Sequence, residues 1–197
     1  MPFNTALETL KGTEKLTTLT NEPELFFLYR TVKLLSHRPN VRILDCGTYS
    51  GVSAMIMAES VIDYGIDAHI DTVDDYSGAG SNAETIREVI QRREYGDTVT
   101  LAESEDIAFI NGCPDSHYDF AYVDSLHRYK HVATLLEALL PKMKRLSYMT
   151  GHDYCLAEPG VMRAVEEWRK NHSDVCVGFG LHGRIWWTAI REAEEYG

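Results

Sequence analysis

The sequence predicts an α/β protein whose doubly wound, mostly parallel sheet ends in an antiparallel hairpin. Short strand-like apolar segments alternate with segments whose apolar residues recur at helical spacing, which is the pattern of parallel strands covered by helices on both faces. Two further strand-like segments flank His182 and Gly183, as in a hairpin. No repeat or linker interrupts the 197 residues, so we expect one domain over 1–197.

A helical segment is expected over residues 1–40, before a core that spans 41–190. Asn21 and Glu24 have the spacing of a capping box, in which each side chain accepts a hydrogen bond from the backbone of the other residue. The helix that follows carries apolar residues on one face: Leu25, Leu28, Val32 and Leu35. The pair Pro39 and Asn40 ends this segment.

The core is expected to contain five strands, the helices between them, and the hairpin. The strands cover residues 41–45, 69–74, 98–101, 118–124 and 146–150, and the hairpin strands cover 175–181 and 184–190. Helices are expected at 52–58, after a cap at 81–84, along the leucine-rich stripe 132–140, and around 161–168. Such sheets bind ligands at the carboxyl ends of their strands, where four acids lie: Asp45, Asp74, Asp124 and Asp153.

The composition argues against several classes of protein. With 30 acidic and 19 basic side chains, the formal net charge is -11, which disfavours binding to a nucleic-acid backbone. No apolar run approaches the roughly 18 residues of a membrane span, and residues 1–20 do not resemble a signal peptide, so a cytoplasmic location is expected. The four cysteines lie far apart, which indicates reduced thiols rather than a zinc site.

The segment from Asp45 to Gly51 has the features of a ligand-binding turn between a strand and a helix. Gly47 and Gly51 permit a positive φ or a close approach of the backbone to a ligand. Their spacing is not that of a dinucleotide loop, and the preceding acid would repel a pyrophosphate. A cationic ligand therefore fits better, although a turn that needs glycine for its geometry alone would show the same residues.

Asp74, at the end of the second strand, is a candidate for binding a ribose. A carboxylate at this position accepts hydrogen bonds from both ribose hydroxyls. Asp75 is the neighbouring candidate. The alternative is a polar turn, because aspartate, serine and glycine are common turn residues.

With these residues in view, the chain resembles the class I S-adenosylmethionine-dependent methyltransferases. The likeness is to the small O-methyltransferases related to macrolide-sugar and catechol methyltransferases, and it extends over about 41–190. It implies a Rossmann-like fold with a seven-stranded sheet. The segments that carry it are ILDCGTYSG, TVDDY, LAESEDIA, DFAYVDSLHRYKHV and GHDYCLAEPGVMRAVEEW.

The resemblance also implies how the cofactor would be bound. Asp45 and Gly47 would lie beside its methionine part, Asp74 on its ribose, and Ser104 and Glu105 near its adenine. The acid before the loop suits this ligand, because the ammonium and sulfonium groups are both positive. The remaining residues of the expected cofactor site are Thr48, Tyr49, Gly51, Asp75 and Asp124.

The resemblance places Asp124, His152 and Asp153 where metal-dependent relatives hold magnesium. This chain departs from them at His152, where a carboxyl or amide ligand is usual, and at Leu126, where some carry aspartate. A magnesium site on Asp124 and Asp153 stays open, but histidine is a poor ligand for this ion. In a metal-free site, His127 or His152 would be the general base.

The sequence therefore predicts an S-adenosylmethionine-dependent methyltransferase that acts on a small molecule at an oxygen atom. Its expected partner is the methyl acceptor, and a homo-oligomer is allowed. One alternative is an NAD-dependent oxidoreductase, which the absent dinucleotide motif disfavours. The other is a domain that binds the cofactor without transferring a methyl group, which the departures at Leu126 and His152 keep open.

Overall fold

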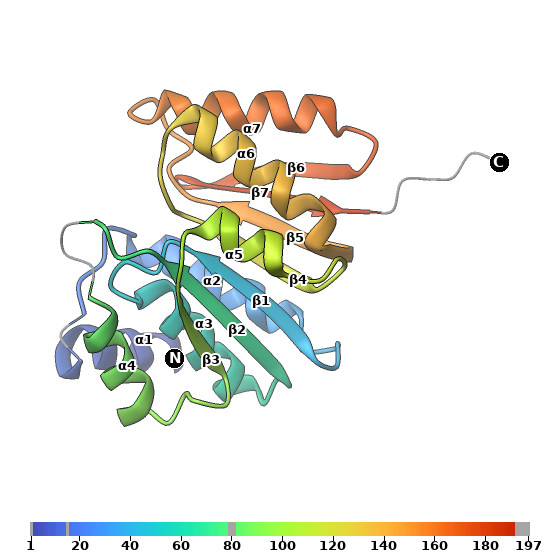
Figure 1. Ribbon diagram of the computed structural model, residues 1–197. Helices are drawn as coiled ribbons and strands as arrows, with labels where there is room; N and C mark the ends of the chain where they lie inside the picture. Colours follow the sequence, from blue (N-terminus) through green and yellow to red (C-terminus); the bar gives the residue numbers. More distant parts are fainter. Residues whose placement is uncertain (1, 15, 79–81, 192–197) are drawn as a thin grey trace.

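The computed structural model describes residues 2–14, 16–78 and 82–191, which form one seven-stranded sheet (Figure 1). The strand order is β3-β2-β1-β4-β5-β7-β6. The first five strands pair in parallel, whereas β7 is antiparallel to both β5 and β6, so the predicted sheet and hairpin are confirmed. The strands are β1 (Val41–Cys46), β2 (Ala68–Asp74), β3 (Val99–Glu103), β4 (Tyr118–Val123), β5 (Met143–Gly151), β6 (Cys176–His182) and β7 (Ile185–Ile190).

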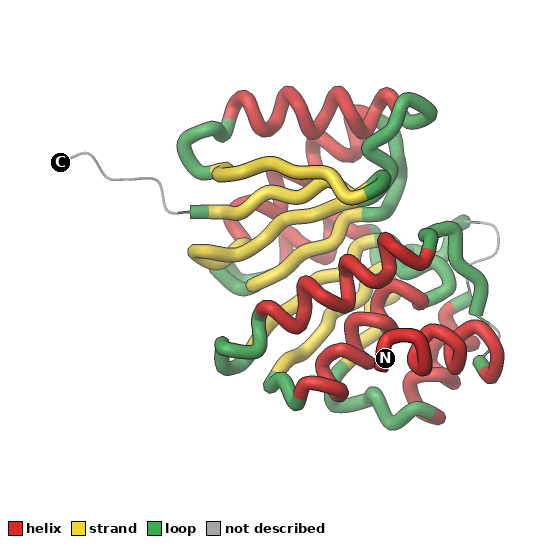
Figure 2. Tube along the Cα trace, turned by 180° about the vertical axis from the view of Figure 1, so that it is seen from behind, coloured by secondary structure: helices red, strands yellow, loops and turns green. Residues whose placement is uncertain are grey.

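Helices cover the two faces of the sheet in two groups. One group is α1 (Pro2–Glu8), the π-helical turn η1 (Thr9–Thr13), α2 (Glu22–Leu34), α3 (Val52–Tyr64) and α4 (Ala83–Arg92). Figure 2 shows the protein from the side of this group. The other is α5 (Asp106–Gly112), α6 (Tyr129–Leu139), the short 3-10 turn η2 (Leu140–Lys142) and α7 (Pro159–Asn171). Along β1, Ile43 packs into the core of the first group and Leu44 into that of the second, as the alternation of strand side chains requires.

The observed starts of the helices agree with the predicted ones, except at the cap of α4 and at the short helices. Asn21 and Glu24 form the predicted capping box at the start of α2. The cap of α4 is Asn82, whose side chain accepts from the backbone of Glu84 and Thr85, and Ser81 lies outside the described residues. The sequence analysis placed α1 within the helical segment 1–40 without its bounds and missed α5, because helices of seven residues carry too few apolar positions to show a period. None of the helices in the described residues has the length and apolarity needed to cross a membrane.

Gly47 lets the end of β1 approach the end of β4. Its φ is +93°, and a Cβ here would overlap the backbone carbonyl of Asp124. Its N–H donates to the carbonyl of Val73 at 2.9 Å, so the turn also touches the end of β2. Gly51 has φ +83° where α3 begins. The predicted need for glycine at both positions is confirmed, and the turn is held against two neighbouring strands.

Gly47→Ala is expected to destabilise the protein by more than about 3 kcal/mol, because backbone would have to move at the centre of the sheet. Gly65→Ala is the matched control. Gly65 also has a positive φ, +59°, but open space surrounds it, so only the cost of the left-handed conformation, about 1–2 kcal/mol, should appear. Urea unfolding of both variants measures the difference. Equal losses would show that the approach to Asp124 carries no cost.

Candidate active site

A cleft of about 690 Å³ opens at the carboxyl ends of the parallel strands. Its walls also include residues 18–20, which precede α2. Most of the residues predicted for the site line this cleft: Gly47, Thr48, Tyr49, Asp74, Asp75, Glu105, Asp124, His127, His152 and Asp153. Three predicted residues do not line it, namely Asp45, Gly51 and Ser104. The cleft therefore joins the expected cofactor residues and the expected acceptor residues in one space.

The carboxylate of Asp74 is fixed at the end of β2 by backbone hydrogen bonds. Oδ2 accepts from the N–H of Tyr49 at 2.8 Å, and Oδ1 accepts from the N–H of Tyr76 at 2.7 Å. Each oxygen keeps a further lone pair, so a ligand with two neighbouring hydroxyls would find two aligned acceptors. Asp75 is exposed and binds the backbone and hydroxyl of Ser77 instead, which lowers its pKa.

A second polar group near β3 was missed by the sequence analysis. Asp106 and His131 line the cleft, and their side chains are 2.9 Å apart. The hydroxyl of Ser125 lies 3.2 Å from the same imidazole nitrogen. Burial opposes ionisation of Asp106, but the hydrogen bonds of His131, Ser125 and the Ile107 backbone, with the charge of His131, together outweigh burial and lower the pKa of this carboxyl. Twenty-five positions separate the two residues, and no local pattern joins them.

Asp45 is buried beneath the turn rather than exposed in the cleft. Its Oδ2 accepts from the hydroxyl of Thr72 at 2.6 Å, and its Oδ1 has no hydrogen-bond partner in the part of the chain that the structure describes. Burial raises the pKa of Asp45 to about 7, and the carboxylates of Asp124 and Asp74 add to this shift. A buried carboxylate without full pairing destabilises the folded protein, which is typical of a residue kept for function.

Asp124, His127 and Asp153 meet at the other end of the cleft. Nε2 of His127 lies 3.1 Å from Oδ2 of Asp153 and 3.6 Å from Oδ1 of Asp124. The Asp124 carboxylate is the main cause of the raised pKa of His127, with Asp153 and Glu158 adding to it. Nδ1 of His127 lies 3.7 Å from Glu158, too far for a hydrogen bond. Nδ1 of His127 therefore has no hydrogen-bond partner among residues 2–14, 16–78 and 82–191.

His152 lies behind this group and differs from His127 in its surroundings. Its Nε2 is 3.0 Å from Oε2 of Glu24, and both side chains are almost fully buried. Nδ1 faces Asp124 at 3.6 Å and Asp153 at 3.4 Å. Burial alone would lower the pKa of His152, but the three carboxylates raise it to about 10. The ring is therefore protonated at neutral pH and is not available as a base.

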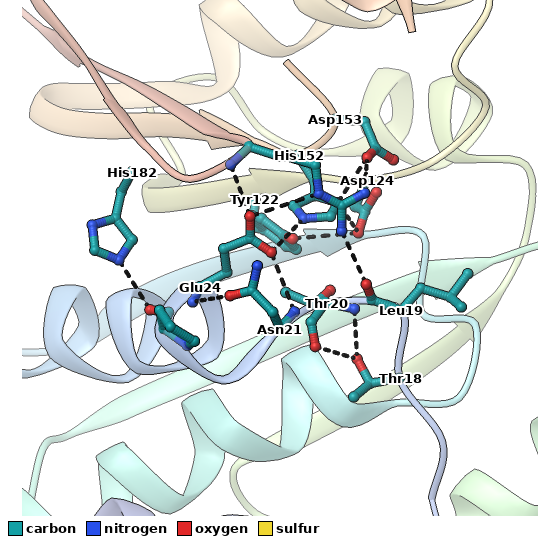
Figure 3. Close-up of polar contacts among 12 residues, drawn as sticks. Thr18, Leu19, Thr20, Asn21, Glu24, Tyr122, Asp124, His152, Asp153 and His182 are labelled. Atoms are coloured by element: carbon teal, nitrogen blue, oxygen red, sulfur yellow. Dashed lines mark hydrogen bonds and ion pairs between the residues drawn. The ribbon is translucent and has the colours of Figure 1, made fainter. Parts of the chain in front are cut away.

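Glu24 and Arg184 complete this end of the site, and the sequence analysis assigned neither to it. Figure 3 shows Glu24 between Asn21 and His152, with the Asp124 and Asp153 carboxylates beyond the imidazole. Oε1 of Glu24 accepts from the backbone N–H of Arg184 at 2.7 Å. The guanidinium of Arg184 lies 2.8 Å from Asp153 and donates to the carbonyl of Leu19. A capping-box glutamate thus also contributes to the candidate site.

The predicted metal ligands do lie together. One ligand atom from each of Asp124, His152 and Asp153 falls within 4.8 Å of the others. The oxygens that magnesium would need are already shared, however, since Arg184 and His127 hold Asp153 and the hydroxyl of Tyr122 lies 3.3 Å from Asp124. This donor set is a poor fit to magnesium, which prefers about six oxygen ligands.

Comparison with known proteins places the chain in a family. The model of a family described as "Methyltransferase domain" matches residues 44–154, which is more than half of the chain and includes the turn at Gly47 and the Asp153 end of the cleft. The chain belongs to this methyltransferase family. The predicted resemblance to class I methyltransferases is confirmed.

Solved structures agree with the fold of this methyltransferase. The O-methyltransferase NovP is 14% identical, with a TM-score of 0.76 over 96% of this chain and 98% of that chain. An O-methyltransferase from Bacillus cereus, solved in complex with SAH, is 13% identical, with a TM-score of 0.68 over 97% of this chain and 90% of that chain. At these identities the likeness shows a shared fold. Curated protein sequences contain no match to the chain.

Asp45→Asn is expected to stabilise the ligand-free methyltransferase, and more so at about pH 8 than at about pH 5. The carboxyl has a pKa of about 7 when folded and an ordinary value of 3.8. Between these values the unfolded chain ionises while the folded chain stays protonated, so the wild type loses stability as pH rises from about 4 to about 7. The loss reaches roughly 4 kcal/mol, and the variant lacks it.

The measurement is thermal unfolding of both proteins across this pH range. Asp97→Asn, the same substitution at an exposed position, is the matched control for the loss of one carboxyl group. A profile that is the same for Asp45→Asn and the wild type would contradict the assignment of a raised pKa to Asp45.

Proposed function

We propose that this methyltransferase transfers the methyl group of S-adenosylmethionine to an oxygen atom of a small-molecule acceptor. One observation carries the proposal. A single cleft holds the fixed carboxylate of Asp74 at one end and the His127 imidazole, between Asp124 and Asp153, at the other. This arrangement leaves room for a nucleoside ligand whose reactive group points away from its ribose toward an acceptor.

The cofactor end favours a ligand with positive charge. Acidic side chains predominate there, with Asp74, Asp75, Glu105 and Asp106 in the lining. A pyrophosphate would be repelled by these carboxylates, which disfavours NAD. A sulfonium and an ammonium group are attracted to the same carboxylates. Asp74 would accept from the ribose hydroxyls, and a cation bound above the turn would favour the ionised form of the buried Asp45.

His127 is the proposed general base. The bound cofactor supplies an electrophilic methyl group, so a bond from the acceptor oxygen to this carbon forms as the carbon–sulfur bond breaks, leaving a thioether. Nδ1 of His127 takes the hydroxyl proton, and Asp124 and Asp153 stabilise the resulting imidazolium. His152 does not take this role, because Glu24 occupies its Nε2 and the ring already carries both protons.

The acceptor end carries exposed apolar side chains beside its charged groups. Leu19 and Leu126 line the cleft and are 79% and 49% exposed. Exposed leucines at the mouth of a cleft are typical of a site that covers an apolar ligand surface. We therefore propose an acceptor that combines a reactive hydroxyl with an apolar portion. The net charge of -11 supports a small molecule rather than a nucleic acid.

Asp74→Ala is expected to weaken binding of S-adenosylhomocysteine by about 1.5–3 kcal/mol, or roughly 10- to 150-fold, because charge-assisted hydrogen bonds to the ribose are lost. Isothermal titration calorimetry measures this affinity. Asp75→Ala is the matched control, since within the described residues the Asp75 side chain accepts hydrogen bonds from Ser77, and its loss should have a much smaller effect. A larger effect of Asp75→Ala would move the ribose site, and equal thermal stabilisation by NAD would overturn the cofactor assignment.

His127→Gln is expected to lower kcat by roughly 10²- to 10⁴-fold, the range for loss of a general base. The wild-type kcat/KM should rise with pH as His127 loses its proton, with a midpoint above the ordinary 6.5 because the carboxylates raise this pKa. The variant should lack this rise. His131→Gln is the matched control, because His131 is paired with Asp106 at the other end of the cleft. A rise that persists without His127 would exclude it as the base.

A further inference from the structure

A buried ion pair connects the first part of the chain to the acceptor end of the cleft. Glu24 lies on α2 and His152 follows β5, 128 positions later. Their side chains are 1% and 2% exposed, so water does not screen the pair. Both oxygens of Glu24 are occupied, one by His152 and the backbone of Asn21, the other by the backbone of Arg184. Glu24 therefore has no freedom to turn away from the imidazole.

Carboxylates face both nitrogens of the His152 ring. Nε2 meets Glu24, while Nδ1 meets Asp124 and Asp153. A neutral imidazole has one N–H and one bare nitrogen, so in either tautomer the bare nitrogen would face carboxylate oxygens that cannot donate. The doubly protonated ring is the form that matches this arrangement.

The oxygens of Asp124 and Asp153 also have partners in other directions, among them the positive charge of Arg184. Arg184 and His127 bind the two oxygens of Asp153, and His127 also faces Asp124. A divalent ion at this point would lie next to the His152 ring and would need oxygens at about 2.0–2.1 Å that the protein has already committed. The donor set thus fits a fixed organic cation and does not fit magnesium.

We propose that the imidazolium of His152 takes the place of a divalent cation beside Asp124 and Asp153, and that Glu24 is the positioning residue that holds it there. The inference rests on the proposed function for its catalytic meaning. An acceptor hydroxyl that loses its proton to His127 develops negative charge close to two carboxylates. The His152 cation offsets these carboxylates, so methyl transfer needs no added metal ion.

The first experiment reads the protonation of His152 directly, by ¹⁵N NMR of histidine-labelled full-length protein at neutral pH. Both ring nitrogens of His152 should carry protons in the wild type. In Glu24→Gln, the ring should become neutral or exchange between tautomers. A neutral His152 in the wild type, or an unchanged doubly protonated ring in Glu24→Gln, would overturn the role of Glu24.

Asn21→Ala is the matched control for the capping box. Asn21 shares the cap of α2 with Glu24, and its side chain accepts a hydrogen bond from the backbone of Glu24. Its loss should lower stability as a cap mutation does, yet leave His152 doubly protonated. Loss of the second proton in Asn21→Ala would show that the cap, rather than the Glu24 charge, holds the ring. Should Glu24→Gln fail to fold, Glu24→Asp, which keeps the charge on a shorter side chain, should displace the His152 signals.

The second experiment measures metal binding by electron paramagnetic resonance of added Mn²⁺. The wild type should bind this ion weakly, whereas His152→Asp, which puts a carboxylate where the cation was, should bind it at least about tenfold more tightly. Wild-type binding as tight as that of His152→Asp would overturn the proposal. Formation of S-adenosylhomocysteine in the presence of EDTA and a panel of hydroxylated acceptors tests catalysis.

The two proposals fail in different ways. If no acceptor is methylated but the NMR and Mn²⁺ results are as expected, the proposed function fails and the built-in cation stands. If methylation occurs but is lost with EDTA and restored by magnesium, the proposed function stands and the built-in cation fails.

Discussion

Backbone hydrogen bonds that continue past the strand ends set the geometry on which the whole cleft depends. Asp124 N–H donates to the carbonyl of Cys46, and His152 N–H donates to that of Val123, at 2.8 and 3.0 Å. On the other side of β1, the N–H of Gly47 binds Val73. The hydrogen bonds of the parallel sheet therefore continue for one residue beyond β1, β4 and β5. They fix the distances between the first residues of the neighbouring loops, as they do for residues within the sheet. Only glycine fits where two of these loops touch.

The two ends of the cleft are built by different physical means. At the cofactor end, backbone N–H groups hold Asp74, so its position depends on loop conformation more than on other side chains. At the acceptor end, side chains of opposite charge hold one another, and Glu24, His152 and Asp153 each depend on a partner from a distant part of the chain. Removal of one member there leaves a buried charge unpaired, which is more costly than loss of one hydrogen bond.

Much of the fold was predictable because its signals are local. Strand segments, the capping box and the acids at strand ends follow from spacing and residue type, and they sufficed to bring Asp74, Asp124, His127 and Asp153 into one cleft. Tertiary contacts were not predictable in the same way. Glu24 already had a local role as a cap, so nothing in its surroundings in the sequence indicated a second role with His152. Arg184 lay in a hairpin turn, and Ser104 turned out to bind the neighbouring backbone away from the cleft.

The different roles of His127 and His152 could not be predicted from the sequence either. His127 and His152 each lie next to or near an aspartate, so residue type and spacing treat them as equivalent. What separates them is exposure, since His127 keeps 37% of its side chain accessible and His152 only 2%. Burial between three carboxylates turns a common titrating residue into a permanent charge, and such an environment exists only in the folded chain.

The position of the hairpin turn determines when the cleft can be completed during synthesis. The contact between Asp74 and Tyr49 joins residues 25 positions apart, whereas the contact between Glu24 and Arg184 joins residues 160 positions apart. Because β7 is inserted between β5 and β6, Arg184 reaches α2 only after the last strands have been made. A nascent chain on the ribosome would thus hold the loops around Asp74 well before it completes the other end of the cleft, and until then Glu24 and Asp153 would lack Arg184, the partner that they share.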